Sequence, residues 1–75
     1  VMIELEVKRQ GGVVAALKKR PEVVQCDTLS GHFDLYVKVE CETASDLDAV
    51  IDWIAEMDGV RRTTSSVILA RKFER

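Results

Sequence analysis

The sequence predicts one α+β domain in which two helices cover a single face of a four-stranded antiparallel sheet. Two observations predict it. Segments of apolar and polar alternation are interleaved with two stripes of helical spacing, and the resulting order along the chain is β-α-β-β-α-β. The length of 75 residues leaves room for one domain, which we place at residues 1–75.

The first strand and the first helix are separated by a pair of glycines. Residues 1–7 alternate and predict a strand, whose apolar face comprises Val1, Ile3, Leu5 and Val7. The segment with Gly11 and Gly12 is expected to end the strand, and a short helix is expected over residues 13–20. The apolar stripe of that helix comprises Val13, Ala16 and Leu17, and Pro21 ends it.

The central hairpin is predicted from two alternating runs, residues 23–29 and 33–41, around a turn at Ser30-Gly31-His32. If Leu29 pairs with Phe33, Cys26 faces Tyr36. The second run has the clearest alternation in the chain, and its apolar face comprises Phe33, Leu35, Val37, Val39 and Cys41.

The second helix is predicted to begin after an N-cap at Ser45 and to end before Gly59. Its apolar stripe comprises Leu47, Val50, Ile51, Ile54 and Met57. Residues 60–69 predict a fourth strand that is apolar on both faces and therefore buried on two sides. Which face of this strand meets a ligand depends on whether a β-bulge interrupts it near residues 63–66.

Two right-handed crossovers in this order give the ferredoxin-like architecture with both helices on one sheet face. The other face has no cover within the chain. It carries a mixture of apolar and charged side chains: Met2, Glu4, Glu6, Asp34, Tyr36, Lys38 and Glu40. Because a small domain buries little surface, we expect a second copy to cover this face and form a dimer.

Charge and composition exclude several classes of partner. Eleven basic and thirteen acidic residues give a net charge of −2, which argues against direct binding of nucleic acid. No apolar run is long enough to span a membrane. Cys26 and Cys41 are expected to be free thiols, as in the cytoplasm, and the lone His32 offers no metal site, so we expect no metal and no cofactor.

Two stretches resemble one family of proteins. Residues 21–35, PEVVQCDTLSGHFDL, resemble the signature P-x-V-x-x-C-x-x-V-[ST]-G-x-[YF]-D, and residues 59–69, GVRRTTSSVIL, resemble the ending G-V-x-x-T-x-T-x-x-V-L. Both belong to the C-terminal effector-binding RAM domain of the Lrp/AsnC (feast/famine) transcription regulators. Leu29 and Ser65 depart mildly from these patterns, where the family often has Val and Thr.

The resemblance implies a homodimer joined through the open sheet faces, assembling further into tetramers or octamers in some members. It implies a small effector, frequently an amino acid, held between dimers near the central hairpin loop. DNA binding would require a helix-turn-helix domain, which we expect to be absent from this chain. The chain is then either a truncated regulator or a natural stand-alone RAM protein.

The candidate effector site combines the hairpin loop with the last strand, and comprises Gly31, His32, Phe33, Asp34, Thr64, Ser65 and Ser66. Backbone N–H groups freed by Gly31 suit a carboxylate, Asp34 suits an ammonium group, and the hydroxyls add short donors and acceptors. The competing interpretation is that Gly31 only makes a tight turn and Asp34 only bonds to backbone within it. His32 occupies a variable position of the motif and is expected to face solvent.

Three alternatives stay open. The chain could be an ACT-like ligand-binding module, a small dimeric α/β-barrel enzyme, or an oligomerisation module without an effector. No Ser/His/Asp or Cys/His arrangement is present in the sequence, so we expect a protein that is not an enzyme.

Overall fold

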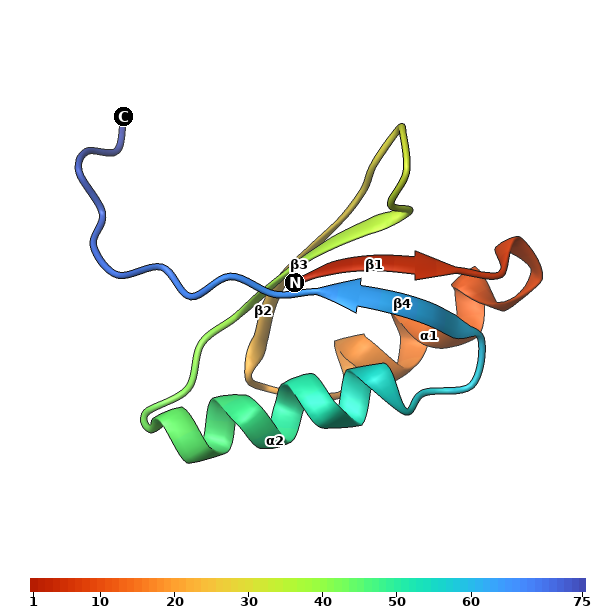
Figure 1. Cartoon of the computed structure of the whole chain (residues 1–75), viewed down its shortest axis with the longest axis horizontal. Coiled ribbons are helices and arrows are strands. Elements are labelled where there is room, and N and C mark those ends of the chain that lie inside the picture. The colour runs from red at the N-terminus through yellow and green to blue at the C-terminus, as the bar shows by residue number, and fades with distance from the viewer.

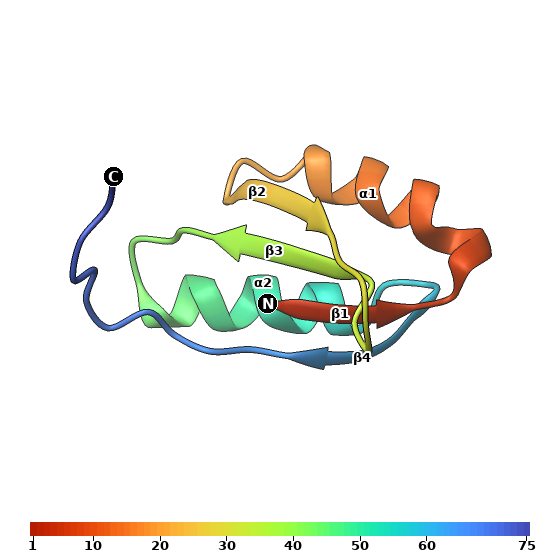
Figure 2. The same cartoon turned by 90° about the horizontal axis from the view of Figure 1, so that it is seen from above.

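A computed structural model describes residues 1–75 and has the predicted ferredoxin-like architecture. The elements are β1 (Met2–Leu5), a 3-10 turn (Val7–Arg9), α1 (Gln10–Lys18), β2 (Val23–Thr28), β3 (Leu35–Val39), α2 (Ala44–Ala55) and β4 (Val60–Thr64). The strands form one antiparallel sheet in the order β2-β3-β1-β4. Figure 1 shows both helices below this sheet, and Figure 2 shows the strand order from above.

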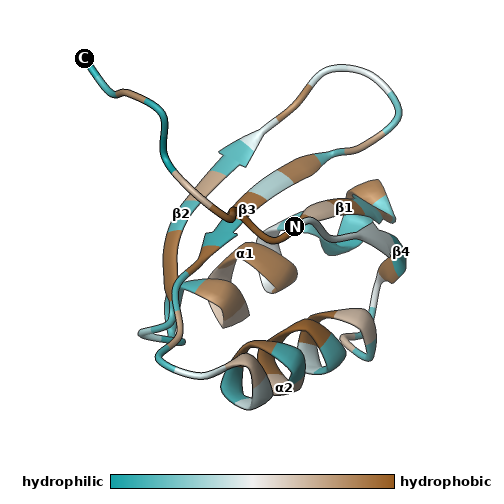
Figure 3. Cartoon of the chain, turned by 60° about the vertical axis from the view of Figure 1, so that its left-hand side comes forward, coloured by the Kyte–Doolittle hydropathy of each residue, from teal (hydrophilic) through white to brown (hydrophobic).

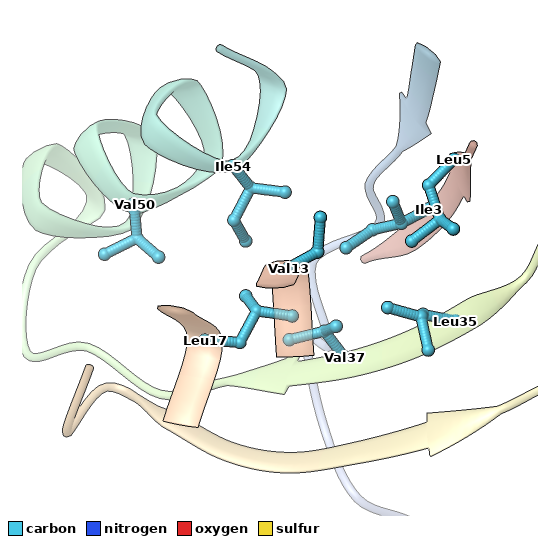
Figure 4. Close-up of a cluster of buried hydrophobic side chains, with 8 residues drawn as sticks. All are labelled: Ile3, Leu5, Val13, Leu17, Leu35, Val37, Val50 and Ile54. Atoms are coloured by element: carbon cyan, nitrogen blue, oxygen red, sulfur yellow. The ribbon is translucent and has the colours of Figure 1, made fainter. Parts of the chain in front are cut away.

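The core lies between the sheet and the helices. Eight apolar residues are buried there: Ile3, Leu5, Val13, Leu17, Leu35, Val37, Val50 and Ile54 (Figure 4). They come from both helices and the two central strands, and all eight belong to the predicted apolar faces, although Val7 and Phe33 of those faces lie outside the core. Figure 3 shows that the apolar side of α2 faces the sheet while its outer side is polar.

The first strand and helix differ from the prediction at their junction. Val7 was expected on the apolar face of the strand, but β1 ends at Leu5 and Val7 is 80% exposed in the 3-10 turn. The helix begins at Gln10 and holds Gly11 and Gly12 in its first turn, so the prediction that it begins only at Val13, after the glycines, is wrong. Glycine weakens a helix by about 1 kcal/mol but does not forbid one.

The second helix also begins earlier than predicted. Its N-cap is Thr43 rather than Ser45, because the Thr43 hydroxyl accepts a hydrogen bond from the Asp46 N–H at 3.0 Å. Asp46 lies in the first turn, where its negative charge complements the helix dipole. The shift leaves the buried stripe of α2 unchanged, because Val50 and Ile54 still face the core.

The hairpin register is one residue away from the predicted one. Leu29 donates to the carbonyl of Asp34, at 2.9 Å, so the loop has four residues (30–33) rather than three. Cys26 therefore faces Val37 rather than Tyr36, and it packs against the core.

The last strand is shorter than predicted. β4 ends at Thr64, and the chain beyond it extends without pairing. Val67, Ile68 and Leu69 are 63–94% exposed, so the expectation that this segment is buried on two sides is wrong for a single chain. The tail and the β2–β3 loop both rise from the sheet on the side away from the helices (Figure 1).

No helix is both long and apolar enough to cross a membrane.

Candidate functional site

The β2–β3 loop lies over the open face of the sheet. From above it crosses β1 and reaches toward β4 (Figure 2). Gly31 has a φ of +117°, a conformation that suits glycine, and open space surrounds its Cα. Gly31 and His32 are exposed at this loop, so backbone and imidazole there are accessible to a ligand.

Phe33 does not lie on the core face, where the alternation placed it. It is half-buried beside β4, with the Arg62 guanidinium 5.1 Å from its ring centroid. Next to it, the Asp34 N–H donates to the Ile3 carbonyl at 2.8 Å, and the regular β1–β3 pairing ends at Leu35, so Phe33 lies outside the alternation of β3. The loop thus carries an aromatic ring toward the open face.

Asp34 joins the loop to the two strands beside it. Its carboxylate Oδ2 accepts a hydrogen bond from the Leu5 N–H at 2.9 Å, and its backbone bonds to both Ile3 and Leu29. At Leu5, where β1 and β3 no longer pair, this carboxylate takes the place of a backbone carbonyl as the acceptor of the Leu5 N–H. The structure therefore gives Asp34 a structural bond, while its second oxygen, Oδ1, makes no hydrogen bond in the chain.

The hydroxyl residues of the candidate site lie at the other end of the sheet. Thr64 pairs with Met2, whereas the Asp34 carboxylate bonds to Leu5, three residues further along β1 or roughly 10 Å at 3.3 Å per residue. One chain does not bring the loop and these hydroxyls together.

A groove of about 570 Å³ lies beside the hydroxyl residues. Thr64, Ser65 and Ser66 line it together with the end of β3 and two apolar residues of α2, Leu47 and Ile51. None of the four loop residues reaches it. Its wall is mostly apolar with a few hydroxyls, a lining typical of small-molecule sites.

Sequence reasoning missed two charged residues beside the loop. Glu4 on β1 and Arg62 on β4 are cross-strand partners with a 3.4 Å contact between their charged groups. Ile3 and Leu5 are buried, so Glu4 between them points to the open face, and Arg62 opposite it shares that face. The alternation of the first strand placed Glu4 on the open face, but no pattern in the sequence indicated that Arg62 lies beside Phe33.

The thiols and the carboxylates do not form a reactive or metal-binding cluster. Cys26 and Cys41 are both free, and burial followed by the charge of Asp27 raises the pKa of the Cys26 thiol above its ordinary value. No group of three or more His, Cys, Asp or Glu side chains is placed to hold a metal ion.

Comparison with known proteins identifies a similar domain. The family model described as the Lrp/AsnC ligand binding domain matches residues 1–75. The chain is 25% identical over 69 residues to the HTH-type transcriptional regulator FL11 of Pyrococcus furiosus, and equally to FL11 of Pyrococcus horikoshii. Each match covers 92% of this chain and 46% of the relative, so the chain spans about half the length of these relatives.

Proposed function

Because the chain belongs to the Lrp/AsnC ligand-binding domain family, we propose that it senses an amino acid and controls oligomerisation in a transcription regulator. The observation that carries the proposal is the β2–β3 loop, which holds a left-handed Gly31 and an aromatic side chain over the open sheet face. The matched relatives are named transcriptional regulators, so the effector would act on DNA binding through another part of the assembly. In this role the domain binds its ligand without converting it, in the cytoplasm.

The proposed oligomer is a homodimer that covers the open sheet face. The chain exposes 5657 Å², whereas a folded monomer of 8.4 kDa exposes roughly 4,600 Å². The excess of about 1,000 Å² is similar to the 800 Å² per partner that a standard interface buries. The exposed tail supplies apolar side chains for such contact: Val67, Ile68, Leu69 and Phe73.

The proposed effector site lies where two dimers meet. Gly31, His32, Phe33 and Asp34 do not line the groove that Thr64, Ser65 and Ser66 of the same chain line. A seam between copies would bring one chain's loop to another chain's hydroxyl groove. Loop N–H groups would then bind the carboxylate of an amino acid, and the apolar groove would hold its side chain.

A thermal-shift screen of the twenty amino acids, followed by calorimetry, tests the ligand. An effector at about 100 times its Kd stabilises the native state by about 2.7 kcal/mol. For a domain of this size, that raises Tm by roughly 10–20 °C. Light scattering after gel filtration tests the oligomer, for which we expect at least twice 8.4 kDa at micromolar concentration. A folded monomer that no amino acid stabilises would contradict the proposal.

A further inference from the structure

The tail, residues 65–75, has few contacts that fix its position. Its backbone makes no hydrogen bond to the sheet or to the helices. Its one ion pair stays within it, because the Arg71 guanidinium contacts the Glu74 carboxylate at 3.6 Å. The tail meets the rest of the chain at the groove described above, where residues 65–68 and Arg71 form part of the lining.

The other lining residues of the groove belong to the sheet and to α2. Leu47 and Ile51 of α2 and Val39 and Cys41 near the end of β3 are all only half-buried there. Dispersion contacts weaken steeply over a gap of less than 1 Å, so an effector side chain gains full contact only when both walls touch it. The tail is the wall that no backbone hydrogen bond holds in place. A bound effector is therefore expected to draw the tail in and fix it.

The tail also has a side that does not meet the groove. Its inner side, Val67 and Ile68, lines the groove and is 64% and 63% exposed. Its outer side, Leu69 and Phe73, does not line the groove and is 94% and 74% exposed. Large apolar side chains gathered on an exposed segment are typical of a contact site for another protein.

Charge and direction favour a second copy of this chain as the partner of the outer side. The tail has three basic residues and one acidic residue, a charge of +2, so residues 1–64 carry −4 of the total charge of −2. Unlike charges therefore meet when the tail of one copy contacts the domain of another. The tail also rises on the side of the open sheet face, which the proposed homodimer covers (Figure 1).

We propose that the tail couples the effector groove to the contact between copies, with its inner side closing on the effector and its outer side packing on a second copy. This inference rests on the proposed function and names the segment that transmits the effect of the ligand. An effector that fixes the tail lowers the entropy cost of ordering it during association, so association becomes tighter. By linkage, association tightens effector binding by the same factor.

The test uses the amino acid that the thermal-shift screen selects, with the unaltered protein and three single variants. Ile68→Ser changes the inner side and Leu69→Ser changes the outer side. The matched control is Val7→Ser, because Val7 is an apolar residue that is 80% exposed and lies outside the groove. Calorimetry gives the Kd of the amino acid, and sedimentation velocity over a series of protein concentrations gives the association constant with and without it. Hydrogen exchange followed by mass spectrometry gives the protection of residues 65–75.

We expect the amino acid to slow hydrogen exchange in residues 65–75 by about tenfold and to tighten association by about tenfold, the value of burying roughly half of one large apolar side chain. Ile68→Ser weakens effector binding by a similar factor. Leu69→Ser weakens association and removes the effect of the amino acid on it, while the amino acid still slows exchange in the tail. Val7→Ser matches the unaltered protein in all three measurements.

An amino acid that binds without slowing exchange in the tail overturns the inference and leaves the proposed function standing. The same holds if the amino acid tightens association of Leu69→Ser as much as it tightens association of the unaltered protein. An unaltered protein that binds no amino acid removes both the inference and the proposed function.

Discussion

Replacing Asp34 by alanine tests whether its carboxylate stabilises the fold. The substitution keeps the two backbone bonds of residue 34, to Ile3 and Leu29, and removes only the acceptor of the Leu5 N–H. Leu5 is 4% exposed, so water reaches the abandoned N–H poorly. An unsatisfied buried group costs about 1–3 kcal/mol, and we expect about 2 kcal/mol here. For a domain of this size, that lowers Tm by roughly 8–16 °C.

Two further variants serve as comparisons for the loss of stability in Asp34→Ala. Asp34→Asn keeps an acceptor oxygen without the charge and is expected to cost about 1 kcal/mol. Asp27→Ala removes an exposed bond from Gln25 and is expected to cost less than about 0.5 kcal/mol. Urea unfolding followed by Trp53 fluorescence, at one fixed protein concentration, gives each free energy. An Asp34→Ala protein as stable as Asp27→Ala would refute the structural role.

Two other substitution and reactivity measurements follow from the same structure. Gly59→Ala is expected to destabilise by about 2–4 kcal/mol, because φ is +97° and a Cβ would lie 2.3 Å from the Cβ of Arg9. Gly31→Ala, with a φ of +117° and open space, should cost only the backbone strain of about 1–2 kcal/mol, and equal losses in urea unfolding would disprove the Arg9 contact. Cys26 should react with iodoacetamide more slowly in the native than in the unfolded protein at pH 8, because burial and then Asp27 raise the pKa of its thiol. Because the native pKa is the higher one, this thiol makes the fold lose stability as pH rises from the ordinary thiol pKa through the native value. Equal alkylation rates by mass spectrometry would contradict the raised pKa.

The sequence predicted the fold because the fold depends on periodicity. Burial of Ile3 and Leu5 from one strand, and of Val50 and Ile54 from one helix, requires only the spacings of two and of three to four residues. These spacings survive an error of a few residues at an element's end. The N-cap illustrates this, since Thr43 and Ser45 place the same apolar stripe against the sheet.

The candidate site was predictable only in part, because it depends on single-residue shifts. The signature identified the loop at Gly31–Asp34, but a loop of four residues instead of three changes which face Cys26 occupies. Likewise, one residue inserted at Arg61 decides whether Arg62 points into the core or over the open face. Neither shift alters the apolar pattern on which sequence reasoning depends.

The β-bulge at Arg61 also explains why a charged residue can follow Val60 so closely on an edge strand. If this sequence paired with β1 without a bulge, Arg62 would lie opposite the buried Ile3, where an unpaired guanidinium would cost several kcal/mol. The inserted Arg61 avoids that cost and restores alternation, because Thr63 then faces the buried Ile3. The same bulge that keeps the core apolar thus also places Arg62 beside Phe33 and Glu4.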